Sequence, residues 1–440
     1  MERIILGRLI RFCIYDNIYM KFTIKGEDVN MKEYKYISLF SGGGIGDIGF
    51  RNADYIPIVM NELEENRAEI IKNNYPDSDV IVGDIATHLE EIYEKALKKL
   101  NGERLFMLVA TPPCQGMSKN GIGSIKKAIR EGKRKKIDER NYLYRYALVL
   151  LQRFRPKFFV WENVDRMFNT LLLNEDGKEV LFVDEFKIQL EKRGYIGKFE
   201  VHNMAEYGIP QNRRRTIGVF VDKELMGEAF DVNKLFPQAI LDKVNFKTVG
   251  ETIGQLPALD SVDKKMAKSD FHPLHFVPVS RPELYYWISN TKPNCSAFDN
   301  NECPECHYIS EKEDVFCKQC GKLLPKPTVE KDGEYRLIKG FVSTYKRMSA
   351  DEPAPTITTR SAYACSDKNI HPTQNRVLSL YEVALLFGIN PNEYKWTVRK
   401  NGKEIYASAM LLRDILGEPV TPVYTKLLGE NLKRIEEMPK

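Results

Sequence analysis

The stretch Tyr36-Ile37-Ser38-Leu39-Phe40-Ser41-Gly42-Gly43-Gly44-Ile45-Gly46 decides the fold class of this 440-residue chain. Residues 36–40 form an apolar run that predicts a short buried strand, and the glycines follow it directly. Glycines after a first strand let the backbone turn tightly, approach a ligand closely and open a helix. A glycine-rich loop alone is equally compatible with a flexible turn, so its meaning depends on the strands that follow.

Two later strand candidates run into acidic residues. Residues 55–60 lead into Asn61-Glu62, roughly 20 positions after the glycine loop, and residues 80–82 lead into Gly83-Asp84. The carboxylate of Glu62 can bind both ribose hydroxyls of a nucleoside cofactor, and the carboxylate of Asp84 can bind an adenine amino group. Each acid alone is typical of a solvated surface charge. Three successive strand ends carrying a glycine loop, Glu and Asp predict a nucleotide-binding α/β sheet.

A cysteine is expected at the next strand end. The segment Thr111-Pro112-Pro113-Cys114-Gln115-Gly116 follows the apolar run 105–110. Prolines stop a strand, which places Cys114 at the edge where open α/β sheets bind ligands. A helix N-terminus or a cation at that edge would favour the thiolate. Because a free Cys is often simply buried, Cys114 by itself fits either a nucleophile or a structural thiol.

Further polar residues are expected at the same edge. The strand candidate 158–161 ends in Glu162-Asn163-Val164, one strand after Cys114. Later, Arg213 and Arg215 occupy alternate positions and would point the same way in an extended segment, although such a cationic turn is also compatible with a surface patch.

The composition is that of an ordinary globular protein, with 43% hydrophobic residues, 29% charged residues and a net charge of +5. No run of 18 apolar residues occurs, so no membrane span is expected. Residues 119–136 contain eight Lys or Arg and one acid. Such a segment is either a solvated loop or a mobile basic loop suited to closing over a polyanion next to a nucleophile.

Four of the eight cysteines form two C-x-x-C pairs separated by ten residues: Cys303, Cys306, Cys317 and Cys320. Since no secretion signal is evident, a metal site is expected rather than disulfides. Four thiolates at this spacing are typical of a zinc ribbon, and four protein ligands leave no open coordination position. The expected zinc is therefore structural and stabilises a small module without a core of its own.

A nucleoside cofactor, a cysteine, a glutamate and an arginine pair on one sheet edge suit chemistry on a pyrimidine. Cytosine C5 is a poor nucleophile, so a thiolate must first add at C6 and push electron density to C5. A carboxylic acid near N3 and a guanidinium near O2 would stabilise the developing charge. C5 can then take a methyl group from a sulfonium donor. The base must leave the duplex, because C6 is inaccessible within the stack.

The ordered motifs resemble those of the DNA (cytosine-5)-methyltransferases. In chain order they are Phe40–Gly46, Asn61-Glu62, Gly83-Asp84-Ile85, Pro112–Gln115, Glu162–Val164, Gln211-x-Arg213-x-Arg215 and Arg376-x-Leu378-Ser379-x-x-Glu382-x-Ala384. The resemblance implies an α/β, Rossmann-like S-adenosylmethionine-dependent methyltransferase domain with a mostly parallel, doubly wound sheet. It also implies a smaller, irregular, β-rich target-recognition domain that reads bases in the major groove, into which the zinc ribbon is inserted.

The resemblance assigns roles to individual residues. Cys114 would be the nucleophile, Glu162 the partner of N3 and N4, and Arg215 the O2 contact. Arg213 would support the site, and Gln115 and Asn163 would complete the catalytic group. The S-adenosylmethionine pocket would be lined by Phe40, Gly42, Gly44, Gly46, Glu62, Leu63, Asp84, Ile85, Pro113, Glu418 and Val420.

One motif departs from the family. The family usually has Gly-Asn-x-Val where this chain has Gly417-Glu418-Pro419-Val420. The carboxylate of Glu418 would either repel the methionine carboxylate of the cofactor or receive its ammonium group.

We expect four segments: an N-terminal extension at 1–33, a catalytic domain at 34–221, a target-recognition domain at 222–375 with the zinc ribbon at 300–324, and C-terminal helices at 376–440 that return to the catalytic domain. Lys318, Lys322 and Lys326 in the ribbon are compatible with phosphate contacts. The expected partners are double-stranded DNA and a cognate restriction endonuclease encoded nearby. The chain is expected to be a cytoplasmic monomer, nucleoid-associated in a prokaryote.

Two other functions remain open at this point. A branch of the family uses the same motifs on RNA, which would make the chain a tRNA cytosine-5 methyltransferase. The chain could also be a catalytically inactive nucleic-acid-binding homologue. The long recognition region favours duplex DNA, and the intact Cys114, Glu162 and Arg215 favour an active enzyme.

Overall fold

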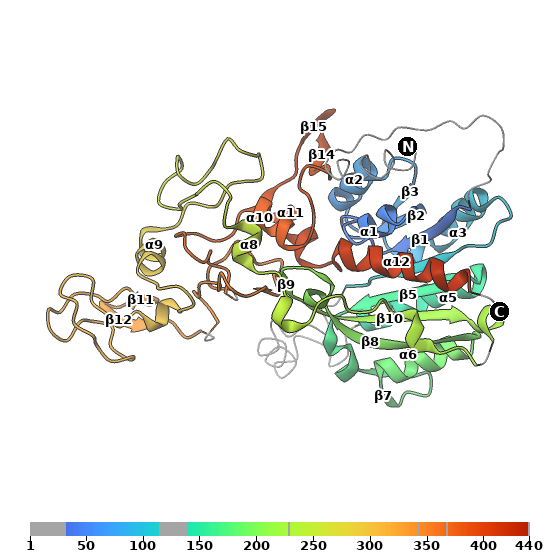
Figure 1. Cartoon of the computed structure of the whole chain (residues 1–440), viewed down its shortest axis with the longest axis horizontal. Helices are drawn as coiled ribbons and strands as arrows, with labels where there is room; N and C mark the ends of the chain where they lie inside the picture. The colour runs from blue at the N-terminus through green and yellow to red at the C-terminus, as the bar shows by residue number, and fades with distance from the viewer. Residues whose placement is uncertain (1–31, 114–138, 228, 341–342, 367, 439–440) are drawn as a thin grey trace, which may run out of the picture. The chain divides into compact units, whose positions relative to one another are not determined.

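The computed structural model describes residues 32–113, 139–227, 229–340, 343–366 and 368–438 (Figure 1). It divides into residues 1–33, of which only Lys32 and Glu33 are described, and residues 34–440. Cys114, Gln115 and the basic segment 119–136 lie outside the described residues. In the described part of the chain, no helix is both long enough and apolar enough to cross a membrane.

A seven-stranded sheet organises the first half of the chain, in the order β3-β2-β1-β4-β5-β10-β8. Its strands are β1 (Tyr34–Leu39), β2 (Tyr55–Glu62), β3 (Asp79–Val82), β4 (Met107–Ala110), β5 (Phe158–Asn163), β8 (Tyr195–Asn203) and β10 (Arg214–Asp222). Of these seven, β10 alone runs antiparallel, between β5 and β8. The predicted α/β class with a mostly parallel, Rossmann-like sheet is confirmed.

Both faces of the sheet are covered, because consecutive residues of its central strands are apolar and their side chains point to both sides. Ile37 and Leu39 pack on one side with helices α3 (Ile85–Leu100), α5 (Tyr144–Phe154) and α6 (Phe182–Glu191). Tyr36 packs on the other side with α1 (Asp47–Asn52) and α12 (Pro422–Glu436), and α12 lies across the sheet in Figure 1. Helix α12 therefore covers the face of the sheet to which Tyr36 points.

The strand order reverses between β1 and β4. The chain moves outward from β1 to β2 and β3, then crosses back to place β4 on the other side of β1. At such a switch point the connections leave the carboxyl ends in opposite directions, and the crevice between them is where open α/β sheets bind ligands. The glycine loop follows β1, and the Pro-Pro-Cys segment follows β4.

The segment after β10 is irregular, as predicted, but the prediction that it is β-rich was wrong. Between residues 223 and 375, the described residues contain only short strands: β11 (Thr328–Lys331), β12 (Glu334–Leu337) and β13 (Ala354–Pro355).

The side chain of Arg347 replaces some of the hydrogen bonds that strand pairing would otherwise supply in this segment. Its buried guanidinium donates to the carbonyl oxygens of Ile288, Thr291, His371 and Gln374, at 2.6 to 3.0 Å. A side chain thus satisfies carbonyls that would otherwise need strand partners.

The remaining elements are shorter or lie at the periphery. The helices are α2 (Glu65–Asn74), α7 (Lys223–Met226), α8 (Val249–Ile253), α9 (Pro282–Ser289), α10 (Leu380–Leu386) and α11 (Ala409–Gly417). The strands are β6 (Leu171–Leu173), β7 (Glu179–Leu181), β9 (Gln211–Asn212), β14 (Thr397–Lys400) and β15 (Lys403–Tyr406). Single 3-10 turns occupy Glu139–Tyr142, Asp165–Asn169, Met204–Tyr207, Val232–Leu235, Lys243–Asn245 and Ala297–Asp299.

Helix α10 begins later than its apolar pattern suggests. The pattern predicts a helix from Arg376, but the helix starts at Leu380 because Ser379 caps it, with Glu382 completing a capping box. Arg376 instead pairs with Glu382 at 2.7 Å, and both side chains are fully buried. This ion pair connects the residues before α10 to the helix itself.

A buried histidine gives the fold a defined pH dependence. His202 on β8 stacks on Phe236, and its Nδ1 lies 2.7 Å from the hydroxyl of Tyr207. Burial lowers the pKa of His202 from 6.5 to about 4. Between these values the unfolded chain binds a proton that the folded chain does not, so stability falls as the pH drops from 6.5 towards 4.

We therefore expect the wild-type protein to lose about 2 kcal/mol more unfolding free energy between pH 7 and pH 5 than a His202→Gln variant, which cannot titrate. Urea unfolding at the two pH values measures this difference, and the comparison cancels the other groups that titrate in the same range. Equal losses in the two proteins would contradict the neutral, buried state of His202.

Candidate active site

The glycine loop after β1 is tightly constrained. Gly44 has a φ of +73°, and a β-carbon there would lie 2.7 Å from the ring of Tyr75, whose hydroxyl donates to the Gly44 carbonyl at 2.6 Å. Gly42 also has a positive φ of +57°, but a β-carbon there would meet nothing within 4 Å. The backbone therefore needs glycine at both positions, and open space lies above Gly42.

Glu62 at the end of β2 faces this loop. Its Oε2 accepts a hydrogen bond from the Gly42 amide at 2.8 Å, and its Oε1 accepts one from the Glu64 amide at 3.0 Å. Burial raises the pKa of Glu62, although the two amides and Arg67 oppose the shift. The predicted carboxylate of Glu62 is thus held against the glycine loop at Gly42, and Leu63 beside it is 62% exposed.

The other predicted cofactor residues surround the same strand ends. Asp84 follows β3 and caps α3, accepting from the Ala86 amide at 2.9 Å, while Ile85 is buried as the first residue of that helix. Val420 is buried near Gly46, whose carbonyl accepts a hydrogen bond from Thr425 at 2.7 Å. Pro113 is exposed after β4, and Phe40 is half-buried with a φ of +60°.

Asn163 positions the residues that precede Cys114. Its side-chain amide donates to the Pro112 carbonyl at 3.2 Å, and its Oδ1 accepts from the Val164 amide at 2.9 Å. Thr111 is held as well, because its hydroxyl donates to the Phe40 carbonyl at 3.0 Å. The end of β4 is therefore fixed to both neighbouring strand ends.

Glu162 and Arg215 form the charged centre of the site. Arg215 Nε lies 3.0 Å from Glu162 Oε1, in an ion pair that is not directed as a hydrogen bond, and both side chains are about nine-tenths buried. Burial raises the pKa of Glu162, while Arg215 and Arg213 lower it. The upward shift favours a carboxyl group that can hold a proton at this position.

Arg213 is fully buried behind this pair. Its guanidinium donates to the carbonyl oxygens of Pro419 (3.0 Å), Ile357 (3.1 Å), Gly417 (2.9 Å) and Glu418 (2.7 Å). Arg215 Nη2 donates to the same Glu418 carbonyl at 3.3 Å. The two arginines therefore converge, as their alternate spacing predicted, and they do so on the segment between α11 and α12.

The side chain of Glu418 has a partner that sequence analysis missed. Arg67 on α2 donates to both carboxylate oxygens of Glu418, at 2.7 and 3.2 Å. The two residues are 351 positions apart, and the only available signal was that a carboxylate replacing the family's amide would need a nearby cation. Gln211 was also left out of the predicted site, although its buried side chain bonds Ile357 N and Leu386 O.

A small cavity of about 50 Å³ lies next to Glu162. Ser38, Asp47 and Thr111 supply polar walls, and residues of α12 close the far side. Asp47 accepts a hydrogen bond from the Tyr36 hydroxyl at 3.0 Å, and burial raises the pKa of Asp47 to about 6. The cavity is large enough for a buried water molecule, which needs roughly 10–15 Å³.

The four clustered cysteines meet in space. Their sulfur atoms all lie within 4.8 Å of one another, and the separations of Cys306 from Cys317 and from Cys320 are both 3.5 Å. In a tetrahedral site with metal–sulfur distances of about 2.3 Å, sulfur atoms are about 3.8 Å apart. Because Cys306 is equally close to two others, the arrangement fits one shared metal ion better than two disulfides.

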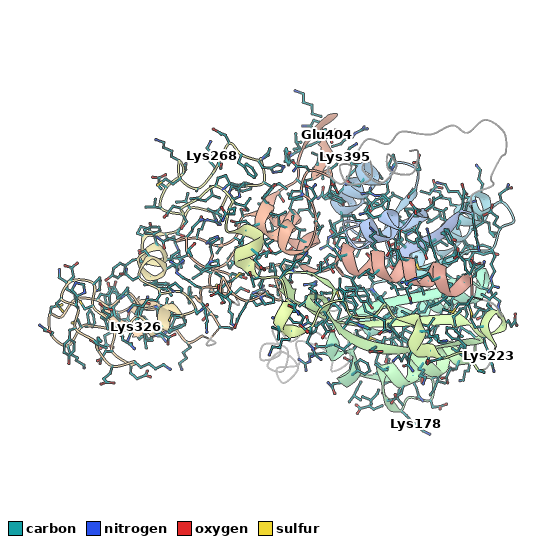
Figure 2. All side chains as sticks on the ribbon, viewed as in Figure 1. Lys178, Lys223, Lys268, Lys326, Lys395 and Glu404 are labelled. Atoms are coloured by element: carbon teal, nitrogen blue, oxygen red, sulfur yellow. The ribbon has the colours of Figure 1, made fainter. Side chains whose placement is uncertain are left out.

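One of the three ribbon lysines differs from the prediction. Lys326 is fully buried, and its ammonium donates to the carbonyls of Glu311, Lys312 and Asp314 at 2.9 to 3.0 Å (Figure 2). Lys318 pairs with Asp314 at 3.0 Å. The prediction of a phosphate contact was therefore wrong for Lys326, which ties the two cysteine pairs together instead.

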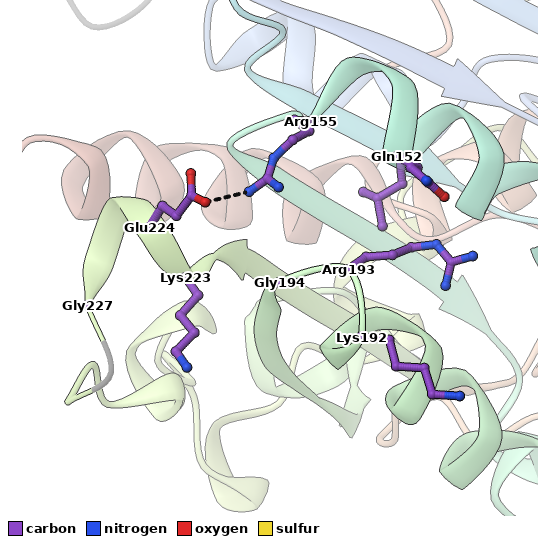
Figure 3. Close-up of a pocket in the computed structure, with 9 residues that line it drawn as sticks. Gln152, Arg155, Lys192, Arg193, Gly194, Lys223, Glu224 and Gly227 are labelled. Carbon is purple, nitrogen blue, oxygen red and sulfur yellow. Dashed lines mark ion pairs between the residues drawn. The ribbon is translucent and has the colours of Figure 1, made fainter.

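A cavity of about 770 Å³ lies beside the residues that precede β8 and follow β10 (Figure 3). Arg155, Lys192, Arg193 and Lys223 line it, and Arg155 pairs with Glu224 at 3.4 Å. Figure 3 shows these cationic side chains pointing in different directions, so they do not converge on one anion. None of the predicted site residues that the structure describes lines this cavity.

The geometry agrees with the protein family that the chain matches. A family described as C-5 cytosine-specific DNA methylase matches residues 34–434. The chain belongs to this family, and it is a DNA cytosine-5 methyltransferase.

Individual relatives align over most of their length. The Type II methyltransferase M1.HgaI of Avibacterium volantium is 30% identical over 411 residues, covering 90% of this chain and 96% of the relative. The Type II methyltransferase M1.HphI of Haemophilus parahaemolyticus is 27% identical, covering 95% and 94%. A crystal structure from E. coli, described as a prophage-encoded DNA modification methyltransferase, has a TM-score of 0.54 at 17% identity, covering 91% and 99%. That last similarity shows the fold alone.

Proposed function

We propose that this methyltransferase modifies one DNA sequence as part of a Type II restriction-modification system, using Cys114 as its nucleophile. The observation that carries the mechanism is the buried Glu162–Arg215 pair, in which Glu162 lies on β5, the neighbour of the strand that precedes Cys114, and Arg215 lies on β10. The curated relatives are named as Type II methyltransferases, which supports the biological setting. A cognate endonuclease encoded nearby and a monomeric state are part of this proposal.

S-adenosylmethionine fits the residues at the switch point of the sheet. The open space above Gly42, the carboxylate of Glu62 and the exposed Leu63 offer room and polar partners for a nucleoside. Asp84 stands at the next strand end. The remaining proposed contacts are Phe40, Gly44, Gly46, Ile85, Pro113, Glu418 and Val420. When bound, the cofactor supplies an electrophilic methyl group.

Each of the proposed catalytic residues has a separate role on the flipped cytosine. Cys114 adds to C6, Glu162 holds a proton at N3 and contacts N4, and Arg215 stabilises charge at O2. Arg213 and Asn163 are positioning residues, since Arg213 fixes the Glu418 backbone and Asn163 holds the Pro112 carbonyl. Gln115 follows the nucleophile and completes the proposed group. The raised pKa of Glu162 supports its role as the proton holder.

Residues 222–375 are proposed as the target-recognition region, with 34–221 as the catalytic domain, 376–440 returning to it and 1–33 as an extension. The cysteine cluster at 300–324 would hold one structural zinc ion. Its small core supports this role, since Leu324 is the main apolar partner of Cys303 and Cys317. Tyr286 on α9 donates to the Leu323 carbonyl at 3.0 Å and attaches the module to the rest of the region.

Freshly purified protein should contain about one zinc ion per chain by metal analysis, since four thiolates occupy every position of a tetrahedral site. A Cys306→Ser variant should lose most of this zinc and bind target DNA more weakly, because the module has little core to hold its shape. A Cys365→Ser variant, altered at an exposed cysteine outside the cluster, is the matched control and should keep both properties. Metal-free wild-type protein would contradict the assignment.

Bisulfite sequencing of DNA from cells that express the chain tests the proposed function. We expect protected cytosines at one recurring sequence and none in cells that express a Cys114→Ala variant. Methylated cytosine in tRNA with unmodified DNA would instead support the RNA substrate and overturn the proposal.

A further inference from the structure

The ion pair between Arg67 and Glu418 connects two elements that flank the proposed cofactor site. Arg67 lies in the first turns of α2, which follows Glu62, and Glu418 follows α11. The contact is bidentate, with Nη1 to Oε2 at 2.7 Å and Nη2 to Oε1 at 3.2 Å. Such fork-to-fork pairs fix the relative orientation of both groups. The side chains remain 19% and 40% exposed, so a ligand can reach them.

The charges around this pair are unbalanced. Burial tends to lower the pKa of Arg67, but the carboxylates of Glu418, Glu62 and Asp414 raise it. Among the described residues, the Arg67 guanidinium therefore interacts with three carboxylates at once. Without Arg67, Glu418 would be an uncompensated negative charge beside two others, which is unfavourable for any ligand that carries a carboxylate.

We infer that Arg67 and Glu418 together recognise the amino-acid end of the cofactor, Arg67 binding its α-carboxylate and Glu418 its α-ammonium group. This inference rests on the proposed function, because it requires S-adenosylmethionine at the switch point. The ribose end is assigned to Glu62 on β2, and the glycine loop packs on α11 through Gly43 and Ile415. The amino-acid end then extends towards the residues that follow α11.

The pairing explains how a carboxylate can replace the family's amide. In the free protein the two side chains neutralise and orient each other. A zwitterion can then insert between them, exchanging one ion pair for two without leaving a net unpaired charge. The Glu418 carbonyl also accepts hydrogen bonds from Arg213 and Arg215, so a ligand at the Glu418 side chain binds to the residue that connects these two arginines.

Titration calorimetry with the full-length protein tests this assignment by comparing two ligands. S-adenosylhomocysteine carries the amino-acid end, whereas 5′-methylthioadenosine keeps the adenosine and the sulfur but lacks it. We expect Arg67→Ala to lower the affinity for S-adenosylhomocysteine by about tenfold, because one charge-assisted contact is lost. The affinity for 5′-methylthioadenosine should stay within about twofold of wild type.

A double variant sharpens the test. Arg67→Ala leaves Glu418 unpaired beside the ligand carboxylate, so adding Glu418→Asn should recover part of the lost affinity for S-adenosylhomocysteine. Lys72→Ala is the matched control, because Lys72 pairs with Glu69 at 2.7 Å on the exposed side of the same helix. It should bind both ligands like wild type.

Two results would overturn the inference. An equal loss of affinity for both ligands in Arg67→Ala would show that the ion pair only holds α2 against the residues after α11. Unchanged binding of S-adenosylhomocysteine would show that the pair does not meet the amino-acid end. Failure of the wild-type protein to bind either ligand would instead refute the proposed function, so the two failures are distinguishable.

Discussion

Replacing Cys114 with alanine should abolish methyl transfer to DNA, lowering the rate by about four orders of magnitude or more. Glu162 and Arg215 can only stabilise charge that the attack of the thiolate creates, so without the thiolate they have nothing to stabilise. Transfer of radiolabel from S-adenosylmethionine to DNA measures the loss. Binding to target DNA, measured by gel shift, should persist because the recognition region is untouched.

Covalent trapping gives an independent readout of the same step. With 5-fluorocytosine at the target position, the fluorine blocks the final elimination, so wild-type protein should form a stable adduct and Cys114→Ala should not. The exposed Cys365 provides the control, since Cys365→Ser should trap normally. Methyl transfer or trapping by the Cys114→Ala variant would refute the proposed mechanism.

Replacing Arg213 with lysine should lower the unfolding free energy by about 3 kcal/mol and reduce the transfer rate as well. Lysine keeps the charge but cannot reproduce a fork that reaches four carbonyls at once. The carbonyls of Gly417 and Ile357 would be left in a buried place without their donor. The Glu418 carbonyl, which also accepts a hydrogen bond from Arg215, would lose its fixed position. Urea unfolding and steady-state kinetics measure the two effects.

The adjacent arginine is a matched control. The Arg214 side chain is 65% exposed and lies 3.7 Å from Asp165, so Arg214→Lys should change stability by no more than about 0.5 kcal/mol. If Arg213→Lys were equally mild, the hydrogen bonds of Arg213 would be replaceable, and its proposed positioning role would be wrong.

Strand ends were the most predictable part of this molecule. Short apolar runs, each followed by glycines, prolines or polar residues, locate β1, β2, β4 and β5, and a parallel sheet brings their carboxyl ends to one edge. Glu62 and Glu162 could therefore be placed from sequence. The capping box at Ser379 was also readable, but the apolar run from Arg376 obscured it.

Contacts between distant segments could not be predicted. The partnership of Arg67 with Glu418 depends on how α11 packs against the glycine loop, and no local pattern encodes it. Lys326 is a similar case, because a lysine in a polar segment normally faces solvent. Its burial follows from three carbonyls that need a donor once the loop between the cysteine pairs folds back.

Helix α12 also bears on how the protein is made. Its backbone accepts a hydrogen bond from Tyr55 at Gly429, and a β-carbon at Gly49 would lie 2.0 Å from the Pro422 carbonyl. The ribosome makes β1 well before α12, with on the order of 20 to 80 seconds between them at about 5 to 20 residues per second. During that interval one apolar face of the nascent sheet is exposed to solvent, and chaperones are expected to bind it. We expect a growing chain to be unable to methylate DNA until α12 has left the ribosome.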